Sequence, residues 1–264
     1  MKFLNILLPF IFLISATLLF SENNESEFCI GVKIKIYSKA LQEEREILLH
    51  LPDDYNSTEN KYPVLFLLDG EWNFLHSISY ITYLSEINIA PKIIIVAIKT
   101  TNRQRDFLPT YVSQVPESGG SDIFITFLED ELIPFVNKNY RTKSNRILYG
   151  ESNSGLFGIY SLLKKPNLFE AYIISSPTVR HDNYFVNKLS LDIFKDSKFP
   201  EKNLIVTYGS DEGEWMISPI LDFINILKNH SPINLKYEII ELEKERHGTP
   251  IALYEALKML YKKQ

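Results

Sequence analysis

The hydrophobic pattern near the start of the chain predicts a hairpin of two strands. Residues 32–37, Val-Lys-Ile-Lys-Ile-Tyr, alternate apolar and charged side chains, and residues 46–51 form a second strand-like stretch. Alternation with a period of two is typical of a strand that buries one face and exposes the other. A Pro-Asp-Asp-Tyr turn at 52–55 ends the second strand, so we expect the two strands to pair antiparallel.

The later apolar stretches are nearly continuous, which is typical of strands in a parallel sheet with helices on both faces. The predicted strands of this kind are residues 64–68, 93–98, 147–149, 171–175, 204–208 and 235–242, and the predicted helices are residues 72–86, 121–137, 156–164, 216–229 and 251–261. This alternation predicts an α/β fold with a mostly parallel central sheet, an antiparallel N-terminal hairpin and helices on both faces.

Residues 100–120 carry two prolines and a pair of adjacent glycines, and they predict a long loop. A loop of this length inside a compact domain is usually functional, so we expect it to line the mouth of a site. Several aromatic and basic side chains could bind an anionic or aromatic group there, or could equally be structural. They are Trp72, Phe74, Arg103, Arg105 and Trp215.

The first 21 residues resemble a signal peptide. Lys2 gives a positive start, residues 3–20 are uncharged and mostly Leu, Ile and Phe, and cleavage is expected after Ser21. An uncleaved membrane anchor is the alternative, because the apolar run approaches the length that spans a bilayer. We expect export to the periplasm or the medium, with residues 22–264 forming a single domain and no stable membrane span after cleavage.

The composition argues against several classes of partner and cofactor. The net charge of −5 and the scattered lysines offer no basic face for nucleic acid. Cys29 is the only cysteine, so no intramolecular disulfide can form, and we expect it to be a buried free thiol. One cysteine and dispersed histidines cannot build a zinc site, and no other metal or cofactor is expected.

Residues 146–155 contain the pattern that points most directly to chemistry. A short apolar strand runs into Gly150-Glu-Ser-Asn-Ser and then into a predicted helix. The related pattern G-x-S-x-G is typical of a strand-to-helix elbow that exposes a nucleophilic serine, here Ser152. The fifth position is Ser154 rather than glycine, although Gly155 follows. On this pattern alone, an ordinary loop between two core elements is an equally good interpretation.

An acid and a histidine follow in the order that such a serine requires. A serine hydroxyl needs a base within reach and a carboxylate that orients the base. Asp211 and Glu212 come after the strand at 204–208, and His247 comes after the strand at 235–242. The order serine, acid, histidine is that of α/β-hydrolases, and the chemistry of such sheets lies at the carboxyl ends of the strands. The remaining histidines are interpreted as ordinary surface residues: His50, His76, His181 and His230.

Six stretches give the chain a resemblance to a known family. They are residues 45–55, 62–70 (Tyr-Pro-Val-Leu-Phe-Leu-Leu-Asp-Gly), 105–110 (Arg-Asp-Phe-Leu-Pro-Thr), 150–157, 208–214 and 247–248. With these, almost everything after the leader resembles the putative esterases of the α/β-hydrolase superfamily, which include esterase D, enterochelin-type siderophore esterases and mycolyltransferases. Among these members, the chain most resembles the siderophore esterases.

The resemblance implies roles for individual residues. Ser152 would be the nucleophile, His247 the general base and then acid, and Glu212 the orienting carboxylate, with Asp211 as the alternative acid. The resemblance also implies an oxyanion hole made of the backbone N–H of Asn153 and one N–H from Gly70-Glu71, for which we take Glu71.

The implied activity is that of an exported serine esterase. It would hydrolyse a small-molecule, lipid or siderophore ester through an acyl-enzyme. Two alternatives remain open at this point. One is a catalytically inactive binding or surface protein, for which Ser154 is the main support, and the other is an acyltransferase that uses the same triad.

Overall fold

The structure is a computed structural model that describes residues 29–195, 198–248 and 250–262. The predicted signal peptide, residues 1–21, lies outside these ranges. Within them, no helix combines the length and the hydrophobicity needed to cross a bilayer. Cys29, expected to be buried, is exposed, so that expectation was wrong.

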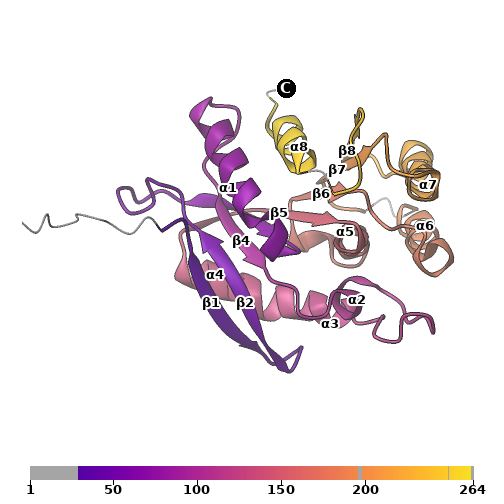
Figure 1. The fold of residues 1–264 in the computed structure, drawn as a ribbon, viewed down its shortest axis with the longest axis horizontal. Helices are drawn as coiled ribbons and strands as arrows, with labels where there is room; N and C mark the ends of the chain where they lie inside the picture. The colour runs from indigo at the N-terminus through magenta and orange to yellow at the C-terminus, as the bar shows by residue number, and fades with distance from the viewer. Residues whose placement is uncertain (1–28, 196–197, 249, 263–264) are drawn as a thin grey trace, which may run out of the picture.

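The described residues form one eight-stranded sheet in the order β1-β2-β4-β3-β5-β6-β7-β8 (Figure 1). Its strands are β1 (Val32–Ser38), β2 (Glu43–His50), β3 (Tyr62–Leu67), β4 (Ile94–Ile98), β5 (Thr142–Glu151), β6 (Ala171–Ser175), β7 (Lys202–Gly209) and β8 (Leu235–Leu242). The pairs β1–β2 and β2–β4 are antiparallel, and all other neighbours are parallel. The predicted α/β fold with an antiparallel N-terminal hairpin is therefore confirmed.

Helices cover both faces of the sheet, as predicted. They are α1 (Gly70–Glu86), α2 (Arg103–Phe107), α3 (Ser121–Thr126), α4 (Ile133–Asn139), α5 (Asn153–Lys164), α6 (His181–Ile193), α7 (Glu214–His230) and α8 (Ile251–Tyr261). Figure 1 shows α1 and α8 together on one face, with α2 to α5 on the other. A π-helical segment, Phe127–Leu132, joins α3 to α4, so the predicted helix at 121–137 is one helical stretch of three parts.

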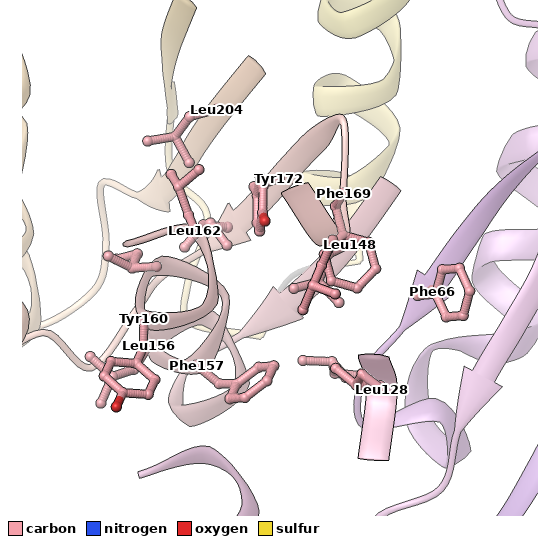
Figure 2. Close-up of a cluster of buried hydrophobic side chains, with 14 of the residues drawn as sticks. Phe66, Leu128, Leu148, Leu156, Phe157, Tyr160, Leu162, Phe169, Tyr172 and Leu204 are labelled. Atoms are coloured by element: carbon pink, nitrogen blue, oxygen red, sulfur yellow. The ribbon is translucent and has the colours of Figure 1, made fainter. Parts of the chain in front are cut away.

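The larger hydrophobic core lies between α5 and the sheet. Leu148 of β5 and Tyr172 of β6 are fully buried there, and Figure 2 shows Phe157 and Leu162 of α5 in the same cluster. Every residue of β3, β4 and β6 is buried. These continuous apolar runs therefore correspond to strands that are covered on both faces.

Two helices were not predicted. The five-residue helix α2 lies within the segment expected to be a loop, and the hydrogen bond from the Arg105 N–H to the Asn102 side chain caps its start. The first turn of α6 contains three residues with positive φ angles, Asp182 (46°), Asn183 (51°) and Tyr184 (62°). An irregular entry of this kind breaks the helical period from which a helix is recognised in sequence.

A buried ion pair fixes α2 against the N-terminal hairpin. Arg45 of β2 is fully buried, and its Nη1 donates to Asp106 Oδ2 of α2 over 2.8 Å and to Glu43 Oε1 over 2.7 Å. Its guanidinium also lies 5.4 Å from the centroid of the Phe124 ring. Because α2 begins at Arg103, this pair also positions the segment that leads to the candidate site.

We expect Asp106→Asn to lower the free energy of unfolding by about 3 kcal/mol, because it leaves the buried Arg45 with one charged partner fewer. Urea unfolding measures this loss. Asp192→Asn is the matched control, since Asp192 pairs with Lys195 at the surface, where both side chains are 74% exposed, and its stability should stay at the wild-type value. Wild-type stability of Asp106→Asn would mean that Glu43 alone compensates the Arg45 charge.

Candidate active site

Ser152 occupies a sharp turn between β5 and α5. Its backbone has φ 60° and ψ −118°, a conformation that side-chain-bearing residues avoid and that surrounding structure must hold in place. The Ser152 N–H donates to the Ser175 carbonyl of β6 over 2.9 Å, and the Ser152 carbonyl accepts from the Leu156 N–H over 2.9 Å. The predicted strand-to-helix elbow is therefore present in the structure.

The close approach of strand and helix at the elbow depends on Gly150 and Gly155. A Cβ added to Gly150 would lie 2.2 Å from the Ser154 carbonyl oxygen, and one added to Gly155 would lie 2.9 Å from the Ser175 carbonyl oxygen. Ser154 itself is fully buried. The turn between β5 and α5 therefore forms with serine, in place of the glycine of G-x-S-x-G, at position 154.

Glu212 and His247 meet at the ends of β7 and β8. Glu212 Oε2 lies 3.3 Å from His247 Nδ1, and Glu212 Oε1 accepts from the Gly209 N–H over 2.7 Å and from the Ser176 hydroxyl. The Glu212 side chain is fully buried, whereas Asp211 is exposed. The two neighbours leave the turn in different directions, and Glu212 is the one that faces the histidine.

These contacts shift both pKa values. Burial raises the pKa of Glu212, but the hydrogen bonds from His247, Ser176 and the Gly209 N–H together outweigh it, so the pKa lies below its ordinary value. The hydrogen bond to Glu212 raises the pKa of His247, and the Glu151 carboxylate adds to this effect, while burial and Arg103 oppose it. With Nδ1 directed at Glu212, the second ring nitrogen of His247 is left available for other contacts.

Ser152 and His247 line the same pocket, which has a volume of about 400 Å³. Trp72, Asn73 and His76 of α1 also line it. His76, interpreted from sequence as an ordinary surface residue, is exposed and still lines this pocket. Among the described residues, none forms a hydrogen bond with the Ser152 hydroxyl.

Asn153 and Glu71, the two residues predicted from the sequence to form an oxyanion hole, lie at the starts of two helices. Asn153 is the first residue of α5 and Glu71 the second residue of α1, so their N–H groups have no carbonyl one helical turn earlier to bond to. Neither N–H donates a hydrogen bond within the described ranges. The two helix N-termini, each with the partial positive charge of the helix dipole, follow the carboxyl ends of β5 and β3.

The aromatic and basic residues singled out from the sequence divide into three groups. Arg103 and Trp72 line the pocket, with the Arg103 guanidinium 5.8 Å from the Trp72 ring centroid. Phe74 is buried in the core, and Arg105 pairs with Glu43, so these two are structural. Trp215 is exposed, and the guanidinium of Arg180 lies 4.5 Å from the centroid of its ring.

Sequence reasoning missed two carboxylates of the pocket, Asp69 and Glu151. Asp69 ends the stretch Leu-Leu-Asp that precedes α1, and Glu151 is adjacent to Ser152, so adjacency to the motifs was the available signal. His181 is half-buried and contacts Thr110 of the 100–120 segment over 3.1 Å. Across the described part of the chain, no cluster of three His, Cys, Asp or Glu side chains could hold a metal ion.

The chain is similar to several known proteins. The profile of the family described as "Putative esterase" matches residues 38–215, which include Ser152 and Glu212. The ferri-bacillibactin esterase BesA of Bacillus subtilis is 30% identical over 148 residues, covering 48% of this chain and 51% of that protein. The siderophore triacetylfusarinine C esterase of Aspergillus fumigatus is 26% identical over 175 residues, covering 61% and 60%.

A solved structure extends the similarity to most of the fold. The IroE-like serine hydrolase of Shewanella oneidensis has a TM-score of 0.84 and 28% identity, over 88% of this chain and 80% of that one. The matches to the two curated relatives span only half to three fifths of their lengths. The family profile nevertheless covers more than half of this chain, and the fold is that of an α/β-hydrolase. The chain belongs to the esterase family that this profile describes.

Proposed function

We propose that the protein is an exported serine esterase that hydrolyses a carboxylic ester through Ser152, His247 and Glu212. The observation that carries this proposal is the arrangement of these three residues. A histidine that faces a buried carboxylate lines the same pocket as a serine on a strand-to-helix elbow with a positive φ angle. This arrangement provides a nucleophile, a base and a group that orients the base.

The first half of the reaction acylates Ser152. Glu212 accepts the Nδ1 hydrogen of His247, so that the other ring nitrogen takes the proton of the Ser152 hydroxyl as its oxygen attacks the ester carbonyl. The carbonyl oxygen becomes negatively charged, and the N–H groups of Asn153 and Glu71 stabilise it. His247 then gives its proton to the departing alcohol.

The second half of the reaction releases the acid. Water enters the pocket, loses a proton to His247 and attacks the acyl group on Ser152. The same two N–H groups stabilise the second tetrahedral intermediate, and His247 returns the proton to the serine oxygen. Glu212 remains ionised throughout, in keeping with the three hydrogen bonds that lower its pKa against the effect of burial.

We propose a siderophore-type ester as the substrate. Two curated relatives carry the names of siderophore esterases, and the pocket is lined by the aromatic ring of Trp72 and by Arg103, whose guanidinium is paired with Asp69. The exposed face of the Trp72 ring suits a substrate that carries aromatic rings. The sequence pattern of residues 1–21 supports an exported enzyme that meets its substrate outside the cytoplasm.

We expect Ser152→Ala to fold normally and to lose ester turnover, leaving only roughly 10³ to 10⁴ of rate enhancement over water. A panel of acyl esters of graded chain length, aryl esters and a catecholate trilactone measures turnover, and circular dichroism checks the fold. The trilactone should be the best substrate. Turnover by Ser152→Ala near the wild-type rate would rule out this nucleophile.

Glu212→Gln and Asp211→Asn should differ widely at equal concentrations of folded protein. Glu212 orients His247 from a buried position, so Glu212→Gln should lower kcat by as much as about 10⁴. Asp211 is exposed, and Asp211→Asn should leave kcat near its wild-type value. The reverse ranking would assign the role to Asp211.

The pH dependence of kcat/KM should show an acidic limb centred above the ordinary histidine pKa of 6.5. The reaction needs neutral His247, and the hydrogen bond to Glu212 together with the charge of Glu151 raises its pKa against the effects of burial and Arg103. Activity is therefore lost as the pH falls through this raised pKa. Glu151→Gln removes one of the two negative charges and should move the limb to lower pH. An unchanged limb in this variant would exclude Glu151 as a determinant of the His247 pKa.

A further inference from the structure

The buried hydroxyl of Ser154 has no part in the reaction described above, yet it joins two segments that the reaction uses. Ser154 lies in the first turn of α5 and is fully buried. Its Oγ lies 2.6 Å from Asp69 Oδ2, and Asp69 immediately precedes α1. The two residues are 85 positions apart in the sequence.

The hydrogen bonds of Ser154 have a defined direction. Its Oγ accepts from the Glu151 N–H over 2.8 Å, and two acceptors lie within reach of its single hydrogen, Asp69 Oδ2 at 2.6 Å and the Glu151 carbonyl at 2.8 Å. The carboxylate is both charged and nearer, so it takes the hydrogen. The Ser154 hydroxyl therefore accepts a hydrogen bond from the elbow, at Glu151, and donates one to Asp69, the residue that precedes α1.

Asp69 is itself rigidly held. Its backbone is left-handed, with φ 50° and ψ 47°, and its carboxylate accepts from Arg103 Nε over 3.0 Å and from Thr100 Oγ1 over 3.0 Å. The next residue, Gly70, packs directly on β4, because an added Cβ would lie 2.7 Å from the carbonyl carbon of Ala97. Ser154 thus attaches the elbow to a segment whose position is already fixed.

We propose that Ser154 is a positioning residue that sets the spacing between the two halves of the oxyanion hole. This inference rests on the proposed function. One N–H, from Asn153, belongs to the residue before Ser154, and the other, from Glu71, lies two residues after Asp69. The Ser154–Asp69 hydrogen bond connects the two chain segments that carry these donors.

The spacing matters because an oxyanion hole works by preorganisation. Both donors must lie about 2.7 to 3.1 Å from the position that the oxyanion occupies, and they stabilise charge that develops only in the transition state. Loss of the link between their segments therefore lowers kcat and leaves ground-state binding, and with it KM, largely unchanged. A residue that only filled space would affect stability and would not single out kcat.

The test compares Ser154→Ala with Thr100→Val, using the ester from the panel that the wild-type protein hydrolyses best. The Thr100 hydroxyl donates to the other oxygen of the same Asp69 carboxylate, and the Thr100 backbone N–H, which donates to the Glu71 side chain, is retained in Thr100→Val. This variant therefore removes a matched hydrogen bond to Asp69 and leaves the Ser154–Asp69 hydrogen bond in place. Ser154→Ala should lower kcat by about tenfold or more. This loss should be smaller than the roughly 10²- to 10³-fold loss that removal of a whole oxyanion-hole donor causes. KM should change by less than about twofold.

Ser154→Gly provides a second variant, because it introduces the glycine of the G-x-S-x-G pattern. It should lose kcat as Ser154→Ala does, although it matches the pattern more closely. Thr100→Val should retain the wild-type kcat, and urea unfolding should show all three variants folded. Equal losses in Ser154→Ala and Thr100→Val, or wild-type kcat in both Ser154 variants, would overturn the inference while leaving the proposed function intact. A wild-type protein that hydrolyses no ester of the panel would overturn both.

Discussion

The positive φ angle of the Ser152 backbone is the constraint on which the rest of the site depends. Such a conformation costs about 1 to 3 kcal/mol for a residue with a side chain, and it persists only where its surroundings determine it. Here the Ser175 carbonyl of β6 holds the Ser152 N–H, and Gly150 and Gly155 permit strand and helix to approach each other. The parallel sheet thus fixes the position of the turn, and Ser152 lines the pocket.

Buried carboxylates organise the surroundings of this elbow, and each has its own set of donors. Glu212 accepts from Ser176 and from a backbone N–H, and it faces His247. Asp69 accepts from Arg103, Thr100 and Ser154, while Asp106 pairs with the buried Arg45. A buried charge without partners is strongly destabilising, so each of these carboxylates restricts the positions of the groups around it. The need of each buried carboxylate for hydrogen-bond or charged partners therefore acts on the fold and on the geometry of the site alike.

In the segment 100–120, a buried ion pair away from the pocket positions a residue that lines the pocket. The sequence predicts a loop at a site, and the structure has the short helix α2, tied to the hairpin through Asp106 and Arg45. Arg103, at the start of α2, can then reach both Asp69 and the carbonyl of Glu151. An anchored segment can place a cationic group beside the pocket with a precision that a freely moving loop does not have.

The sequence alone determined the fold class, because strand and helix periods are local properties of the chain. It also nominated Ser152, His247 and the pair Asp211 and Glu212, since each follows a recognisable strand and the carboxyl ends of parallel strands meet at one edge. Only the tertiary structure decided which carboxylate faces His247, because that depends on how the chain turns after Gly209. Only the tertiary structure, likewise, brought Ser154 to Asp69. A contact across 85 residues follows from strand order and helix packing, which leave no trace in the local pattern.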